Sequence, residues 1–250
     1  MKSLLPQIIA HRGNAAEFPE NTLAALQSAV ALGVRHLEFD IQLTSDRVPV
    51  LLHDADFKRM GGRTDSVFDL SWSEVRGISV GEPGRFGARH ADARPSSLEQ
   101  VAAALEQWPD VTAYVEIKRA SLRRFGQQVV LERVMARLPA VLERCVLISF
   151  DLPCLEQLRR DCAARVGWVL PSFDEASRAQ AGALQPAFLF CDLDRLPPEG
   201  APLWTGPWDW AIYEVRDLAT ARACRARGAG FVETMTVRAL VDEFDRARAR

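Results

Sequence analysis

Two carboxylates, one residue apart, interrupt a stretch that otherwise has the pattern of a β-strand. In VRHLEFDIQL, at residues 34–43, Glu38 and Asp40 alternate with large apolar residues. Because side chains of a strand point alternately to opposite faces, the two acids should share one face while the apolar residues enter a core. Two buried like charges are unfavourable unless a cation or strong donors compensate. The spacing therefore indicates either a metal-binding strand or, as in most alternating strands, a half-exposed strand whose acids are in water.

Two histidines end neighbouring apolar runs, and both are candidates for proton transfer. His11 follows the run at residues 7–10, and His53 follows the run at residues 48–52. Histidine exchanges protons near neutral pH, so the two could act as general acid and general base. A lone histidine is usually structural, but a pair beside carboxylates and cations suits phosphoryl chemistry. In such chemistry, a cation and basic side chains neutralise the phosphodiester while the imidazoles take and give protons.

A third carboxylate and two cations end strand-like runs nearby. Glu116 and Lys118 share one face of YVEIK at residues 114–118, and Arg12 follows His11. Three carboxylates with no suitable cysteine or histidine cluster favour a hard ion, so Mg²⁺, Ca²⁺ or Mn²⁺ rather than zinc. Lys118 is one of three lysines among 31 basic residues, and its compact charge suits a phosphate group. The alternative is a structural salt bridge of Glu116 with Lys118 or Arg12.

The elements that must position these residues alternate along the chain. Apolar runs typical of strands recur at residues 7–10, 34–43, 111–118, 145–150, 166–170, 187–191, 210–215 and 231–234, and residues 48–52 continue the second run in extended form. Amphipathic runs typical of helices lie at residues 21–32, 96–107, 125–138, 152–161, 173–183, 218–227 and 237–248. Asn21 is placed to cap the first helix. This pattern predicts an α/β fold, a (β/α)8 TIM barrel rather than a doubly wound sheet.

The barrel should form a single domain over residues 1–250, with an insertion at about residues 55–94. In the insertion Gly, Asp, Arg and Ser accumulate, and only residues 71–78 suggest a short helix, with Ser71 and Glu74 at capping-box spacing. A loop of this length in a compact domain usually has a function. We expect it to lie over one end of the barrel as a lid or small subdomain.

Composition limits the partners and the compartment. The net charge of −2 gives no reason to expect a nucleic-acid or anionic-membrane surface. Five cysteines without a CxxC pair indicate reduced thiols rather than a disulfide framework or zinc site. The first apolar run is too short for a signal peptide, and none approaches the roughly 20 residues that cross a bilayer. We therefore expect a soluble, cytoplasmic protein with a small-molecule substrate, no nucleic acid and no stable membrane insertion, while its oligomeric state is open.

With these residues in place, the chain resembles the glycerophosphodiester phosphodiesterase family. The shared motifs are AHRG at 10–13, ENT at 20–22, LEFDIQLTSD at 37–46, VLLHD at 50–54, PSSLEQV at 95–101, VEIK at 115–118 and SF at 149–150. They lie in the family's order over about the first 150 residues. The resemblance implies a (β/α)8 barrel with a small insertion after strand 2. It also implies metal-dependent cleavage of glycerophosphodiesters into sn-glycerol 3-phosphate and an alcohol.

The resemblance assigns roles position by position. It implies an acid–base pair, His11 and His53; three metal ligands, Glu38, Asp40 and Glu116; two phosphate contacts, Arg12 and Lys118; and an EN pair that shapes the substrate site, Glu20 and Asn21. The last third departs from the family, with IYEVR at 212–216 and ETMTV at 233–237. Tyr213 and Glu233 are still expected at the mouth, with Tyr213 as a substrate contact.

The sequence leaves the reaction details open. It does not say which histidine is the acid, or whether water or the glycerol's neighbouring hydroxyl is the nucleophile. A related barrel lyase that acts on lysophospholipid or sphingolipid head groups and releases a cyclic phosphate is one alternative. The altered last strands suggest another, a non-catalytic barrel that binds glycerophosphodiesters or a metal as a sensor, although the intact histidine pair argues against it.

Overall fold

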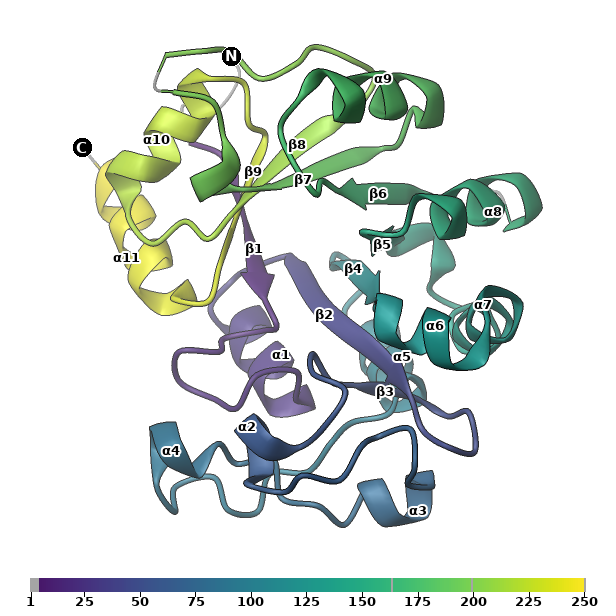
Figure 1. The fold of residues 1–250 in the computed structure, drawn as a ribbon. Helices are drawn as coiled ribbons and strands as arrows, with labels where there is room; N and C mark the ends of the chain where they lie inside the picture. The colour runs from purple at the N-terminus through teal and green to yellow at the C-terminus, as the bar shows by residue number, and fades with distance from the viewer. Residues whose placement is uncertain (1–4, 163, 199, 250) are drawn as a thin grey trace.

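Eight parallel strands close into a barrel in the computed structural model, which describes residues 5–162, 164–198 and 200–249. In ring order they are β1 (Gln7–His11), β2 (His36–Leu43), β4 (Thr112–Ile117), β5 (Cys145–Ser149), β6 (Val166–Val169), β7 (Phe188–Asp192), β8 (Asp209–Tyr213) and β9 (Phe231–Thr234). Because β1 pairs with both β2 and β9, the sheet has no open edge in the ring. The predicted (β/α)8 TIM barrel is confirmed (Figure 1).

Helices surround the strands. They are α1 (Leu23–Ala31), α5 (Leu98–Glu106), α6 (Arg119–Phe125), α7 (Gln127–Met135), α8 (Leu152–Cys162), α9 (Glu175–Leu184), α10 (Leu218–Ala226) and α11 (Val237–Arg248), with 3-10 turns at Leu142–Arg144 and Leu193–Arg195. The cap predicted at Asn21 is wrong by one residue, because the Thr22 side chain accepts the hydrogen bond from the Ala25 N–H. The helix α6 was not predicted, since its seven residues RASLRRF show little apolar periodicity.

Apolar side chains fill two layers. The larger one lies between the strands and the helices and includes Leu37, Phe39 and Ile41, the outward-facing residues of β2. The smaller one fills the barrel interior, with Tyr114 and Phe188 among its members. The alternation predicted for β2 is therefore confirmed. Its apolar residues pack between the strands and the helices, and its acidic residues point into the barrel interior.

The extended run after β2 turns back. Strand β3 (Pro49–Leu51) pairs antiparallel with β2, Ile41 opposite Leu51. The prediction that residues 48–52 continue strand 2 is thus wrong, since a tight turn at residues 44–47 reverses the chain and Arg47 adopts a left-handed φ of 63° there. The reversal returns His53 to the level of Asp40, whose backbone oxygen accepts a hydrogen bond from the Leu52 N–H.

The inserted residues form a small packed unit. Within the described residues it carries three short helices, α2 (Lys58–Gly61), α3 (Trp72–Val75) and α4 (Pro83–Phe86). The Ser71–Glu74 capping box is present at α3, although the helix is shorter than the predicted 71–78. An apolar cluster that includes Phe57 and Met60 joins the unit to β3. Figure 1 shows these helices beside α1 and β3, outside the ring of strands. Single-domain organisation stays a prediction.

None of the described helices combines the length and the apolar character that a membrane span needs.

Candidate active site

The strand register brings the three predicted metal ligands together. Between β1 and β2, His11 lies opposite Glu38, and between β2 and β4, Asp40 lies opposite Glu116. The acids are 1 %, 0 % and 8 % exposed in the order of the sequence, and one oxygen of each lies within 4.8 Å of the others. Glu38 and Asp40 are therefore inside the barrel, and the half-exposed strand that the sequence left open is excluded.

Two cations hold two of the three acids. The Lys118 Nζ lies 3.1 Å from Asp40 Oδ1 and 3.0 Å from Glu116 Oε1. The Arg12 Nε lies 3.2 Å from Asp40 Oδ2. The alternative salt bridge of Glu116 with Lys118 is therefore present. Burial raises the pKa of Asp40, but Lys118 and Arg12 more than offset this and hold it well below its usual range.

Glu38 is the acid that lacks such a cation. Its Oε2 accepts a hydrogen bond of 3.0 Å from the Arg12 N–H, while its Oε1 is buried without a partner among the described residues. Burial and the charges of Asp40 and Glu233 raise the pKa of Glu38 well above its usual value. A hard divalent ion would supply the missing partner, and an all-oxygen donor set suits Mg²⁺, Ca²⁺ or Mn²⁺. The site thus fits such an ion, and Glu38, Asp40 and Glu116 would be its ligands.

Asn21 and Glu20 support these groups from behind. Asn21 Nδ2 donates to Asp40 Oδ2 over 2.8 Å, and Asn21 Oδ1 accepts from the Asp40 N–H over 3.0 Å. Its backbone is left-handed, with φ of 56°, a conformation that asparagine tolerates better than most residues. Glu20 accepts a hydrogen bond of 2.8 Å from Arg12 Nη1. Neither residue is among the described residues that line the central cavity, so both shape the site through Arg12 and Asp40.

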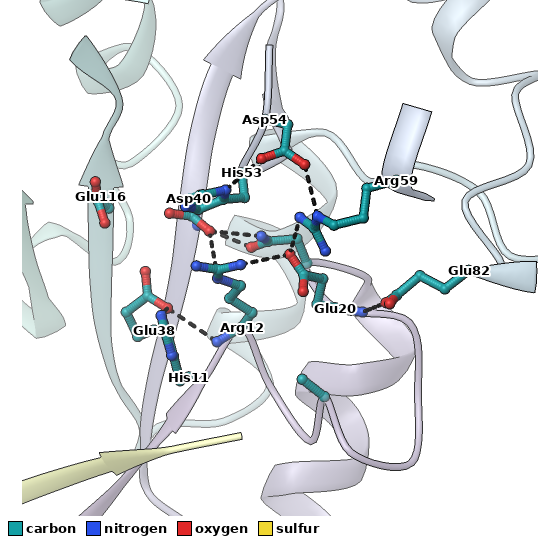
Figure 2. Close-up of polar contacts among 12 residues, drawn as sticks. His11, Arg12, Glu20, Glu38, Asp40, His53, Asp54, Arg59, Glu82 and Glu116 are labelled. Atoms are coloured by element: carbon teal, nitrogen blue, oxygen red, sulfur yellow. Dashed lines mark hydrogen bonds and ion pairs between the residues drawn. The ribbon is translucent and has the colours of Figure 1, made fainter. Parts of the chain in front are cut away.

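The two histidines lie in different electrostatic surroundings. His11 Nδ1 contacts Glu214 Oε1, and its Nε2 lies 3.8 Å from Glu38 Oε2. Burial lowers the pKa of His11, but the negative charges of Glu233 and Glu214 more than offset this and leave it raised. His53 Nδ1 lies 2.8 Å from an oxygen of Asp54 (Figure 2), and burial lowers the pKa of His53.

Two further acids approach His11 without having been assigned a role. Glu233 is buried, and its Oε1 has no partner among the described residues. Burial raises the pKa of Glu233 to about 7. An acid alternating with apolar residues in β9 was the available signal for it. Glu214 follows β8, and nothing in the local pattern shows that it reaches His11, 203 residues away in sequence.

One cavity of about 120 Å³ joins most of the predicted residues. The predicted residues that line it are His11, Arg12, Glu38, His53, Glu116, Lys118 and Tyr213. Glu233, also expected at the mouth, lines it as well, and its remaining walls are four apolar side chains, Ile148, Phe150, Val169 and Phe190. A wider cleft of about 600 Å³ continues outward past Tyr213 and Glu214. The arrangement places acidic side chains suited to a metal ion, cationic side chains suited to a phosphate group and two imidazoles around one small space.

Comparison with known proteins identifies the group to which this barrel belongs. The profile of the glycerophosphoryl diester phosphodiesterase family matches residues 11–161, more than half of the chain. The chain belongs to the glycerophosphoryl diester phosphodiesterase family. Among curated relatives of this family, glycerophosphodiester phosphodiesterase 1 of Homo sapiens is 31 % identical over 153 residues, which are 61 % of this chain and 45 % of the relative.

A curated bacterial relative also matches part of this chain. Glycerophosphodiester phosphodiesterase of Caldanaerobacter subterraneus subsp. tengcongensis is 37 % identical over 101 residues, which are 40 % of either chain. The chain thus spans less than half the length of these curated relatives. A solved structure of an Oleispira antarctica phosphodiesterase with its product sn-glycerol-3-phosphate superposes with a TM-score of 0.81 at 20 % identity, over 96 % of this chain and 97 % of that one. At this identity the superposition shows the shared fold.

Proposed function

We propose that this member of the family is a divalent-cation-dependent glycerophosphodiester phosphodiesterase that releases sn-glycerol 3-phosphate and an alcohol. The observation that supports it best is one cavity lined by two histidines, two cations, Glu38 and Glu116, with the buried Asp40 grouped with these two acids directly behind it. The names of the matching relatives agree with it. A small, polar cavity suits a phosphate ester more than a large apolar ligand.

The proposal gives each side chain a role. Glu38, Asp40 and Glu116 would hold the cation, which would supply charge neutralisation at the phosphoryl oxygens. Arg12 and Lys118, which reach the cavity, contact the phosphate and favour the charge that builds up on it.

The two imidazoles carry the protons. One of His11 and His53 removes the proton of the nucleophile, which is water or the neighbouring hydroxyl of the glycerol, and the other protonates the leaving alcohol. Tyr213 lies where the cavity opens into the wider cleft, and we propose that it contacts the substrate there. A cytoplasmic location is part of the proposal and is supported by five free thiols in the described residues.

Phosphorus NMR of the reaction with glycerophosphocholine tests the function. With Mg²⁺, Ca²⁺ or Mn²⁺ present, we expect glycerophosphocholine to be replaced by a phosphate monoester that a coupled assay identifies as sn-glycerol 3-phosphate. The matched control is the same protein in EDTA, where turnover should stop and should return when the ion is added back. Binding without turnover under every ion would refute the enzyme and leave the non-catalytic barrel.

A second function has a specific observation behind it. Lysophospholipase D of Homo sapiens is 31 % identical to this chain over 167 residues, which are 62 % of the chain and 53 % of that protein. The apolar side chains on one wall of the cavity would suit a substrate with a longer hydrocarbon part. A higher turnover rate on lysophosphatidylcholine than on glycerophosphocholine would favour lysophospholipase D activity. A cyclic phosphate product would favour the lyase.

A further inference from the structure

We propose that Arg59, which belongs to the insertion, is a positioning residue that orients His53 and Arg12 for the proposed reaction. The inference rests on the proposed function and extends it to a residue outside the barrel and outside the cavity. Arg59 lies in the helix α2. Its guanidinium reaches two carboxylates at once, and each carboxylate in turn holds one side chain of the site (Figure 2).

The first branch runs from Arg59 to His53. Arg59 Nε donates to Asp54 Oδ2 over 2.8 Å, and the other oxygen of Asp54 lies 2.8 Å from His53 Nδ1. An ionised carboxylate only accepts, so His53 Nδ1 carries the hydrogen in this contact. The neutral imidazole then has its free lone pair on Nε2, the nitrogen available for proton transfer in the cavity that His53 lines. Asp54 is partly exposed, with 31 % of its side chain accessible, so Arg59 is what restrains its second oxygen.

The second branch runs from Arg59 to Arg12. Glu20 Oε1 accepts from Arg59 Nη2 and from Arg12 Nη1, each over 2.8 Å. The other side of the Arg12 guanidinium lies against Asp40, with 3.2 Å between Nε and Oδ2. The two arginines lower the pKa of Glu20 in spite of its burial, so it stays ionised. With Glu20 fixed by Arg59, Arg12 is held between two immobilised carboxylates.

An arginine is required because one side chain must make both bonds. The Nε and Nη2 atoms of a rigid planar fork serve Asp54 and Glu20 simultaneously, whereas a lysine offers one point charge on a flexible stem. Substituting Arg59 by Lys should therefore keep one branch at most.

The insertion is attached to the site by other contacts that do not use Arg59. Glu82 Oε1 accepts from the Glu20 N–H over 2.9 Å, Arg85 Nη1 donates to Glu82 over 2.7 Å, and His90 Nε2 lies 3.1 Å from the Glu17 backbone oxygen. The Arg59 side chain itself is 42 % exposed. Its removal leaves these attachments and opens no core cavity, so variants at Arg59 should fold.

Steady-state kinetics of Arg59 variants on glycerophosphocholine test the inference. We expect R59A to lower kcat by about 10- to 100-fold, the usual effect of losing an outer orienting partner, and R59K to recover part of the loss. The change in KM should stay below about threefold, since Arg12 keeps its contact with Asp40 and Lys118 does not depend on Arg59. Added guanidinium ion should restore part of the R59A rate and none of the H53A rate.

The matched control is R63A. Arg63 lies in the same insertion and pairs with Asp65 over 2.8 Å at an exposed position. The R63A variant should keep the wild-type kcat. If Arg59 acts through Asp54, the kcat of the double variant D54N/R59A should be little lower than that of the more impaired single variant.

Nitrogen NMR of the imidazoles separates this inference from the proposed function. In the metal-supplemented wild-type protein, His53 should show the tautomer with hydrogen on Nδ1, and R59A should show a mixture, with the H53N spectrum giving the assignment. An inactive wild-type protein whose R59A variant still shifts the tautomer would refute the phosphodiesterase and keep the positioning role. An active protein whose R59A variant keeps the wild-type kcat and tautomer, with or without a lower Tm, would overturn the role of Arg59.

Discussion

At the scale of single residues, the two histidines are the groups whose removal should affect chemistry more than binding. We expect H11A and H53A to lower kcat on glycerophosphocholine by about 100-fold or more, with little change in KM, because the proposed proton transfer is lost while the proposed phosphate contacts remain. Steady-state kinetics measure both constants. The control is H36N, since His36 bonds Gln7 at the far end of β2. Wild-type turnover by either alanine variant would remove that histidine from the mechanism.

Glu233 gives a prediction about pH. Its folded-state pKa is raised from 4.5 to about 7, so the folded state binds a proton that the unfolded state releases. Its contribution to stability is complete below pH 4.5 and is lost as the pH rises through 7. In EDTA, the free energy of unfolding of E233Q minus that of the wild type should therefore rise by about 3 kcal/mol between pH 4.5 and pH 8.5. Each pKa unit corresponds to about 1.4 kcal/mol.

Urea unfolding of both proteins at the two pH values measures this difference. A stability difference between E233Q and the wild type that does not change with pH would show that Glu233 is already ionised across the range.

At the scale of elements, the loop between β1 and α1 depends on Gly13. This residue has φ of +79°, and a Cβ there would lie 2.6 Å from the backbone carbon of Ala25. G13A should therefore destabilise the fold by about 2–3 kcal/mol and lower activity, because Arg12 is the preceding residue.

Gly33 provides the control for backbone strain alone. It has φ of +86°, and apart from its chain neighbours no described residue has an atom within 4 Å of the position that a Cβ would take there, so G33A should lose only about 1–2 kcal/mol of stability. Urea unfolding compares the two variants. Equal losses would mean that the contact with Ala25 relaxes without cost.

Elements with strong periodicity were predictable, and those set by turns were not. The two-residue alternation of β2 predicted its inner and outer faces, because one face had to be buried. The reversal into β3 escaped prediction since an extended run looks alike in either direction. Asn21 and Thr22 are both good caps, and only the structure shows that Asn21 is engaged with Asp40 instead.

The same distinction applies to the site. Residues at strand ends were predicted to meet, because parallel strands in a closed barrel present equivalent ends at one mouth. The structure brings all of them but Asp40 to one cavity, and Asp40 lies beside Glu38 and Glu116. Glu214 and Arg59 carried no such signal. Their contacts depend on how a loop and an insertion fold against the barrel, which no local pattern encodes.

At the scale of the whole molecule, ion binding should stabilise the fold. Glu38, Asp40 and Glu116 are buried close together, and a cation that binds only the folded state adds about 2.7 kcal/mol at 100 times its Kd. Thermal unfolding should therefore show a Tm that rises with Mg²⁺, Ca²⁺ or Mn²⁺ concentration.

E116Q is the variant to compare, because it keeps the shape of the ligand and loses its charge. Its Tm should respond much less to the ion. The exposed-site variant E99Q is the control and should behave as the wild type. An equal rise in Tm for all three proteins would place the ion elsewhere.

The cavity is also asymmetric around the ring. Charged and polar groups come from β8, β9, β1, β2, β4 and the turn after β3, whereas β5, β6 and β7 contribute Ile148, Val169 and Phe190. A combinatorial library confined to these three positions would reshape the space offered to the ester group and leave every ionisable side chain in place. Directed evolution of new leaving-group preferences in the proposed reaction therefore has three neighbouring strands of the barrel on which to work.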